Sequence, residues 1–327
     1  MNKKIATILL IGGALFLNAC QKSSDIFVPD PGQLNAPDTT WSNTIATSAP
    51  VFSLQTNLKI EPLKDSFEVN NTIATILTAS GVQVTFSPNC CVSSTGQTVT
   101  GKVYAEVLLI KKKGDMVLMN KPTTSNGSML VSGGEIFIRL MKDGKELQLA
   151  PNAKIKITYT DVPVNPNMKL FFGDESNPLQ FSWLPNTDTA NNSVTAGQQL
   201  YEIYTNHLRW INVDYFYDTT GIARSTVSTQ LPSNYTNANT SAFLVFKDLR
   251  SVLAMHGDVP EKRFITGKVP NGKIATVVAI SKQGNDYFMG KELITTGVNV
   301  NTANNQKVIL SPVKTSLAEI KLFLATL

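Results

Sequence analysis

Few residues of this chain have the types and spacing that usually carry chemistry. The two histidines, His207 and His256, lie far apart and in no metal-ligand spacing such as His-x-x-x-His. No Gly-x-Ser-x-Gly turn presents a serine nucleophile, and no glycine-rich loop is present to bind phosphate. The polar stretch 186–192 holds oxygen donors but lacks the acidic density of a calcium-binding EF-hand loop. We therefore predict that the protein is not an enzyme and holds no metal and no cofactor.

Cysteine chemistry is restricted to Cys20, Cys90 and Cys91. If Cys20 carries another group, the only disulfide left within one chain joins the adjacent Cys90 and Cys91, and such a bridge closes a strained ring. Free cysteine is among the residue types most often buried. We therefore favour two reduced thiols, at least one packed as a small hydrophobic side chain, over a vicinal disulfide.

Two tryptophans, Trp183 and Trp210, are the candidate ligand-binding residues. An exposed ring can stack on the face of a sugar, whereas a buried ring supplies core area. At the period of a strand, Trp210 shares its face with Asn212, Asp214 and Phe216, and the opposite face is the more apolar one. This pattern leaves exposure of Trp210 open. Core packing is the favoured interpretation of both rings, and sugar binding is the alternative.

The first twenty residues have the anatomy of a secretory signal peptide. Lys3 and Lys4 are followed by an apolar stretch over residues 5–17, and the segment ends in Ala19 and Cys20. The apolar stretch is shorter than the roughly 20 residues that a spanning helix needs. After Cys20 the chain becomes polar at once, so a transmembrane anchor is the weaker interpretation.

The residues Leu17-Asn18-Ala19-Cys20 resemble a bacterial lipobox. This resemblance implies that the signal is cut before Cys20 and that the thiol of Cys20 is lipidated. One acyl chain binds a membrane only marginally, so a multiply acylated Cys20 would be a sufficient anchor. The following Gln-Lys and nearby Asp25 resemble the signal that sends some Bacteroidota lipoproteins to the cell surface. We expect a lipid anchor in the outer membrane, on its periplasmic or cell-surface face.

The composition fits a globular protein with a substantial core. The chain has 327 residues, of which 42% are hydrophobic and 16% charged, and this length allows two domains. Removing the signal takes away two of the 29 basic residues and none of the 24 acidic ones, which leaves a net charge near +3. Such a charge is too small to indicate nucleic acid as a partner. The expected partners are the membrane, through the lipid, and a glycan or a protein.

Period-two patterns dominate the chain after residue 50 and predict an all-β fold. Strands are expected over residues 72–77, 82–86, 99–110, 136–141, 146–149 and 153–159, and further strands follow up to residue 310. The sequence Lys-Asp-Gly-Lys at 142–145 predicts a hairpin turn. Helices are expected only at 247–255 and 311–327, the latter with leucine and isoleucine at helical spacing. The basic residues 111–114 are expected to form a solvated turn.

These patterns divide the chain into four predicted segments. Residues 1–19 form the signal peptide, and residues 20–50, rich in Pro, Asn, Ser and Thr, form a flexible tether. Residues 51–195 form a β-sandwich with linker strands. Residues 196–327 form a second β module with the C-terminal helix packed on it.

Several motifs resemble the ZU5-like β-sandwich of uncharacterised Bacteroidota lipoproteins. They are residues 81–89, Gly96, residues 99–103, 133–138 and 143–147. Relatives usually have a large apolar residue at the position of Cys91, which implies a buried thiol. Residues 208–214 resemble the Trp-Ile-Asn-Cys-Asp signature of the second module, with Val213 in place of the cysteine. The resemblance spans roughly residues 60 to 325, implies tandem β modules, and is nearly silent about activity.

Three functional hypotheses follow. The first is a membrane-anchored, non-enzymatic lipoprotein that acts as a binding, adhesion or scaffold component. The second is a glycan-capture lipoprotein of a polysaccharide-uptake system, which rests on the aromatic strands and the location. The third is a hydrolase with a carboxylate pair, because the spacing of such a pair is spatial and cannot be recognised in a sequence.

Overall fold

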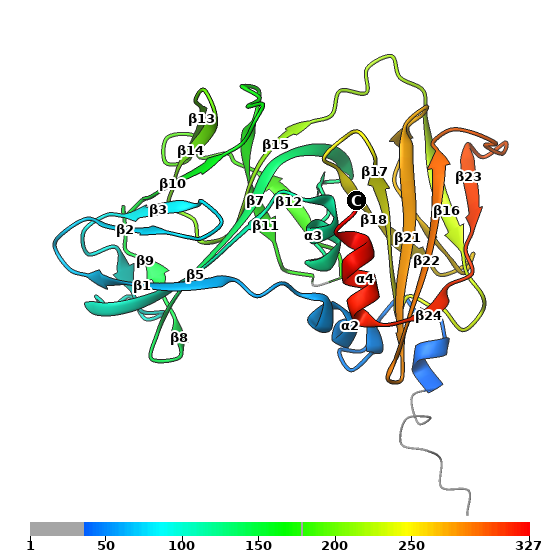
Figure 1. The fold of residues 1–327 in the computed structure, drawn as a ribbon, viewed down its shortest axis with the longest axis horizontal. Helices are drawn as coiled ribbons and strands as arrows, with labels where there is room; N and C mark the ends of the chain where they lie inside the picture. Colours follow the sequence, from blue (N-terminus) through cyan, green and yellow to red (C-terminus); the bar gives the residue numbers. More distant parts are fainter. Residues whose placement is uncertain (1–35, 178) are drawn as a thin grey trace, which may run out of the picture. The chain divides into compact units, whose positions relative to one another are not determined.

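The computed structural model describes residues 36–177 and 179–327. The predicted signal peptide and the first part of the predicted tether lie outside the described residues. Strands hold 48% of the residues and helices 9%, which confirms the predicted all-β fold class. Most of the strands belong to three sheets, in which neighbouring strands are mainly antiparallel (Figure 1).

Two sheets face each other across the first hydrophobic core. The strands of the first sheet, in order, are β1 (Leu63–Val69), β5 (Gly101–Ile110), β7 (Ser128–Lys142), β15 (Arg209–Phe216), β11 (Lys169–Asp174) and β12 (Ser182–Pro185), with β6 (Thr124–Ser125) and β8 (Lys145–Glu146) paired to β7. The second sheet has the order β13 (Ser193–Ala196), β14 (Leu200–Thr205), β10 (Ile155–Thr160), β3 (Gln83–Phe86) and β2 (Ala74–Leu77). A small pair, β4 (Cys91–Val92) and β9 (Gln148–Leu149), lies beside them. Their alternate apolar side chains, such as Val84, Ile157 and Val213, form this core.

The third sheet carries the second half of the chain. Its order is β20 (Val269–Pro270), β16 (Arg224–Gln230), β19 (Arg263–Ile265), β18 (Val252–Asp258), β17 (Thr240–Phe246), β21 (Ile274–Gln283), β22 (Asp286–Thr295) and β24 (Val313–Thr315), and β23 (Asn305–Ile309) pairs in parallel with β16. Strand β17 is buried on both faces. Phe243 and Val245 enter one core, whereas Leu244 and Phe246 enter another.

Short helices lie between the first and third sheets (Figure 1). They are α2 (Pro50–Leu58), α3 (Lys113–Leu118) and α4 (Leu317–Leu324), and a 3-10 turn, η1 (Ala36–Thr39), precedes them. Ile320 and Leu324 of α4 are fully buried in the core that these helices share with both sheets. The predicted spacing of apolar residues in the C-terminal helix is therefore confirmed, and the helix also packs against α3 and α2.

Some predicted elements differ from the structure. Residues 247–255 form a turn and then β18, because Val252–Asp258 pairs with β17 and the Phe246 N–H donates to the Ser251 carbonyl. The C-terminal helix begins at Leu317 instead of near Ser311. A capping box of Ser316 and Glu319 fixes this start, since the preceding residues pair with β22 as β24.

The other two helices were not predicted. Residues 111–114 were expected to be a solvated turn, yet α3 begins at Lys113, whose Nζ donates to the Phe246 and Lys247 carbonyls at 2.6 Å each. Helix α2 begins at Pro50, which suits a first helical position because proline lacks the N–H that would be unpaired there. At the end of the predicted tether, Asp38, Trp41 and Ser42 contact Asn239, Phe264 and Asn237 of the second half of the chain.

Strands from both sides of residue 195 share sheets. Strand β14 pairs with β10, and β15 lies between β7 and β11. Asp161 is buried between Arg250 and Lys111, at 3.1 and 3.0 Å, so an ion pair also joins the two parts. The boundary predicted at residue 195 thus does not separate the sheets.

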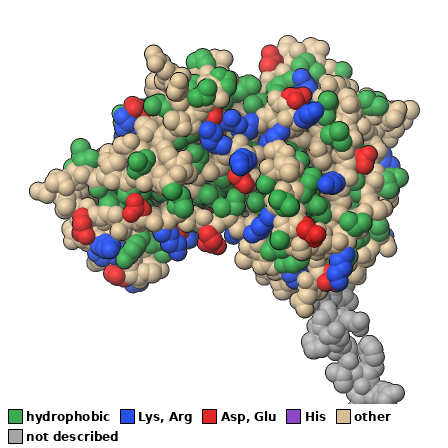
Figure 2. Space-filling view, viewed as in Figure 1, with side chains coloured by type: hydrophobic (Ala, Val, Ile, Leu, Met, Phe, Trp, Pro, Cys, Tyr) green, Lys and Arg blue, Asp and Glu red, His purple; other side chains and the backbone are tan. Residues whose placement is uncertain are grey.

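Within the described residues, no helix is long and apolar enough to cross a membrane. On the face drawn in Figure 2, basic and acidic side chains are mixed, and apolar side chains are scattered among them.

Candidate binding pocket

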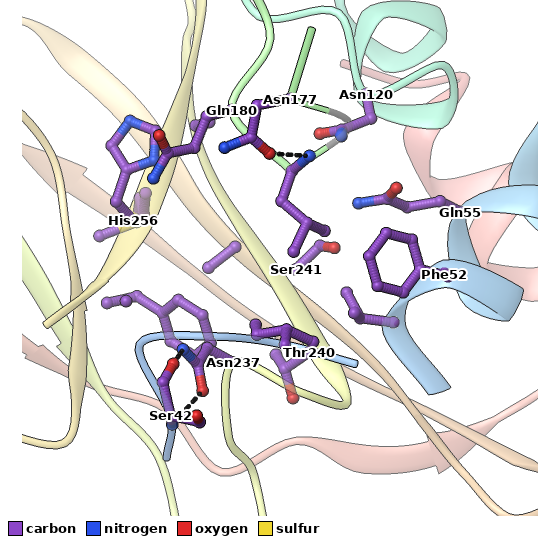
Figure 3. Close-up of a pocket in the computed structure, with 18 of the residues that line it drawn as sticks. Ser42, Phe52, Gln55, Asn120, Asn177, Gln180, Asn237, Thr240, Ser241 and His256 are labelled. Carbon is purple, nitrogen blue, oxygen red and sulfur yellow. Dashed lines mark hydrogen bonds between the residues drawn. The ribbon is translucent and has the colours of Figure 1, made fainter. Parts of the chain in front are cut away.

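A cavity of about 500 Å³ opens where residues 42–55 meet the third sheet. Its walls come from residues 42–47, helix α2, strands β17 and β18, and the loop residues Asn120, Asn177, Leu179 and Gln180. The volume is in the range of small-ligand sites, about 300–1,000 Å³. Figure 3 shows side chains from these separate segments converging on one space.

The lining of this cavity is polar but carries no formal charge at neutral pH. Among the described residues that line it, there is no Asp, Glu, Lys or Arg. The polar lining consists of amides and hydroxyls, namely Ser42, Asn43, Thr44, Thr47, Gln55, Asn120, Asn177, Gln180, Asn237, Thr240 and Ser241. Amides and hydroxyls both donate and accept hydrogen bonds. The cavity therefore suits a neutral ligand with many hydroxyl or amide groups.

Residues 38–51 are held in place by the loop before β17. The Asn237 side chain bonds Ser42 twice, accepting from its N–H at 3.2 Å and donating to its carbonyl at 2.7 Å. Thr236 Oγ1 donates to the carbonyl of Asp38, and the Val51 N–H donates to the Ala238 carbonyl at 2.9 Å. These bonds turn an otherwise irregular segment into a fixed wall.

Helix α2 supplies the opposite wall because it is amphipathic. Leu54 and Leu58, one turn apart, are buried in the core. Phe52 and Gln55 lie at a spacing of three residues and line the cavity (Figure 3). Both are only partly buried, so a ring face and an amide are available to a ligand.

His256 is the titratable residue of the pocket. It lies on β18 and points toward Gln180 in Figure 3. The imidazole is open to the cavity, but the surrounding protein atoms partly desolvate it and lower its pKa. At neutral pH the ring is therefore uncharged and can donate with one nitrogen and accept with the other.

A second cavity of about 400 Å³ adjoins the first. The two share Gln180, Ala254 and His256 as lining residues. Its other walls include the β6–β7 hairpin, Phe181 and Gly267.

The predicted ligand-binding tryptophans lie together, but in the core instead of in a cavity. Trp183 is fully buried and donates its Nε1–H to the Pro122 carbonyl at 3.0 Å. Trp210 is 5% exposed, and its ring centroid lies 6.4 Å from that of Trp183. A buried ring cannot stack on a sugar, so core packing, the favoured interpretation, describes both residues. The predicted lipidation residue, Cys20, lies outside the described residues.

The Trp-Ile-Asn-x-Asp signature has a structural explanation. Ile211 and Val213 face the first core, while the alternate residues surround a buried polar cluster. The Lys121 ammonium lies 4.9 Å from the Trp210 ring centroid, and burial lowers the pKa of Lys121 to about 8. Asn212 Nδ2 donates to Asp214 Oδ2 at 2.7 Å. Trp210, Asn212 and Asp214 of the signature therefore contact polar groups inside the protein.

Two carboxyl groups of this cluster are fully buried. Glu135 on β7 lies opposite Asn212 on β15, and Asp214 follows two residues later. Burial raises the pKa of Asp214 to about 7, and burial together with Asp214 raises the pKa of Glu135 well above its ordinary value. Neither residue is among those lining the two cavities, so this carboxylate pair does not face a substrate space there.

The remaining candidates from the sequence behave as packing or loop residues. Cys90 and Cys91 are free and buried, with Sγ atoms 3.2 Å apart, and the hydrogen bond with Cys90, together with burial, raises the pKa of Cys91. His207 stacks on Phe172 with ring centroids 3.8 Å apart. In the loop 186–192, Asp188 accepts bonds from the backbone and side chain of Asn191, which occupies its carboxylate. The described residues contain no cluster of His, Cys, Asp or Glu suited to a metal ion.

No protein-family model and no curated protein matches this chain. The resemblance to ZU5-like modules therefore stays a prediction.

Sequence reasoning missed every amide of the pocket. Asn43 lies in the predicted tether, Gln55 in the predicted β-sandwich and Asn237 in the predicted second module, and the sequence analysis singled out none of them. Only the density of Asn, Gln, Ser and Thr between residues 42 and 55 and again between 233 and 241 hints at them. Such residues are common in surface loops, so their convergence could not be recognised without the fold.

Proposed function

We propose that this protein is a non-enzymatic lipoprotein, anchored to the outer membrane through lipid on Cys20, which acts as a binding, adhesion or scaffold component. The observation that carries this proposal is the first cavity. It offers many hydrogen-bonding groups, yet within the described part of the chain His256 is the one titratable side chain that lines it. A binding site without an acid–base pair or a nucleophile–base pair suits recognition better than catalysis.

The chemistry of the cavity favours glycan capture as the second candidate function. Sugar hydroxyls both donate and accept, as do the amides and hydroxyls of the lining. The partly exposed ring of Phe52 adds an apolar surface for the C–H face of a sugar. This argument replaces the one based on Trp183 and Trp210, since both rings are buried.

Gln55→Ala tests this second candidate on the full chain purified in detergent. The parent is expected to bind neutral glycans on an array. The variant should bind the same glycans about tenfold more weakly, because it loses one or two hydrogen bonds of about 1 kcal/mol each. Thr56→Ala is the matched control, since Thr56 is the next residue of α2 and is exposed to solvent. A parent that binds no arrayed glycan would reject glycan capture.

Cys20→Ala tests the anchor. Cells grown with a clickable fatty acid should label the parent and leave the variant unlabelled, because lipidation needs the Cys20 thiol. Ser23→Ala, three residues further on, should keep the label. Equal labelling of the parent and Cys20→Ala would show that the lipobox interpretation is wrong.

A further inference from the structure

We propose that the two cavities are subsites of one groove that binds a linear, neutral oligosaccharide across the Gln180–His256 wall. The inference rests on the proposed glycan-binding function. It adds that the glycan is an oligosaccharide long enough to occupy both cavities. A ligand confined to one cavity would leave the other unused.

The shared wall is the observation that carries the inference. Gln180 and His256 line both cavities, and both side chains are exposed. No hydrogen bond joins either side chain to another of the described residues. The two side chains lie between the cavities, and their hydrogen-bonding groups are available to a ligand. This wall is suited to bind the unit of a chain that passes over it, because each group can both donate and accept.

The second cavity shares the amide and hydroxyl groups of the first and adds one charged side chain, the exposed Lys268, whose ammonium can donate to sugar hydroxyls. Thr124, Asn126 and Ser182 supply the hydroxyl and amide groups of the second cavity. A chain of similar units therefore meets similar groups on both sides of the wall. An extended peptide would instead be expected at an open sheet edge, where backbone hydrogen bonds provide most of the affinity. The repeated amide-and-hydroxyl lining favours repeated sugar units.

Gly267 allows the second cavity to be blocked alone. It lines that cavity but not the first. Among the described residues, the only neighbour within 4 Å of an added Cβ is the Gly127 carbonyl oxygen at 3.8 Å, so a Cβ at this position makes no clash. Gly267→Leu should fill the second cavity and leave the first intact. Thr220→Leu, an exposed residue outside both cavities, is the matched control.

The experiment measures the affinity of the full chain in detergent for xylo-, manno- and malto-oligosaccharides from two to six units by calorimetry. For the series that binds, we expect the hexasaccharide to bind the parent and Thr220→Leu at least about tenfold more tightly than the disaccharide. Gly267→Leu should remove this gain and keep the disaccharide affinity, which Gln55→Ala should weaken.

Each other outcome overturns the inference. Affinity that does not depend on length, or a hexasaccharide that binds Gly267→Leu as well as the parent, would show that one cavity suffices and would leave glycan capture intact. If no oligosaccharide binds the parent, while an extended peptide does, both the two-subsite groove and the glycan function are wrong.

Discussion

Replacing Glu135 with glutamine should raise the free energy of unfolding at pH 8.5 and change it little at pH 5. The Glu135 carboxyl is fully buried, and neither oxygen has a hydrogen-bond partner among the described residues. Burial and the nearby Asp214 carboxyl raise its pKa well above 4.5. The folded protein therefore holds this proton more tightly than the unfolded chain does, and stability falls as the pH rises above about 4.5. Glutamine has nothing to ionise, so the variant avoids this loss.

Asp214 causes a separate loss of stability with the same sign. Burial raises its pKa from 3.8 to about 7, and one pKa unit corresponds to about 1.4 kcal/mol. The loss of stability from Asp214 thus develops between about pH 4 and pH 7 and approaches about 4 kcal/mol above that range. Glu135 should cause a loss of the same sign, which begins near pH 4.5 and continues as the pH rises.

Urea unfolding from pH 5 to pH 9 measures the difference. Glu106→Gln is the matched control, because Glu106 is also buried in the first sheet but accepts hydrogen bonds from Arg139. Neutralising Glu106 removes an ion pair and should lower stability at pH 8.5, the opposite sign. If the free energy of unfolding depends on pH in the same way for the parent and Glu135→Gln, the Glu135 carboxyl is not buried without a partner.

Gly114→Ala should destabilise the protein by about 3 kcal/mol, near the upper end of the cost of overpacking. An added Cβ at Gly114 would lie 1.9 Å from the carbonyl oxygen of Leu324 and 2.5 Å from its carbonyl carbon. These are backbone atoms of α4, so no side-chain rotation can relieve the clash. Helix α4 would have to move away from α3, which exposes Ile320 and Leu324.

The midpoint of urea unfolding measures this loss, with Gly267→Ala as the control. An added Cβ at Gly267 makes only an ordinary contact, so its effect should stay within about 0.5 kcal/mol. If Gly114→Ala is as stable as the parent, the close contact between α3 and α4 does not exist in solution.

The sequence correctly predicted the elements that are determined by residues close to one another in the chain. The hairpin at 142–145 formed as expected, with Asp143 and Gly144 at φ values of 50° and 74°, and β2 and β3 formed close to the predicted residues. Helix α3 was missed because its start depends on Lys113, which bonds carbonyls more than 130 residues away. Strand β18 was mistaken for a helix because its edges are decided by pairing with β17 and β19.

The pocket could not be predicted for a related reason. Its amides come from four separate stretches, and each stretch alone is typical of a surface loop. The tryptophans were the visible aromatic signal, but the three-dimensional packing of Phe181, Trp183 and Trp210 buries all three. Only the fold distinguishes an aromatic ring that fills the core from one that lines a cavity, as Phe52 does.

The wall formed by residues 42–55 has a practical consequence for truncation. A shortened chain that begins at Leu63 would keep all the strands, from β1 to β24. It would lose Ser42, Phe52 and Gln55, and with them one side of the first cavity. Such a fragment could fold into sheets and yet bind nothing, so a soluble version for ligand screening should retain the sequence from about residue 37 onward.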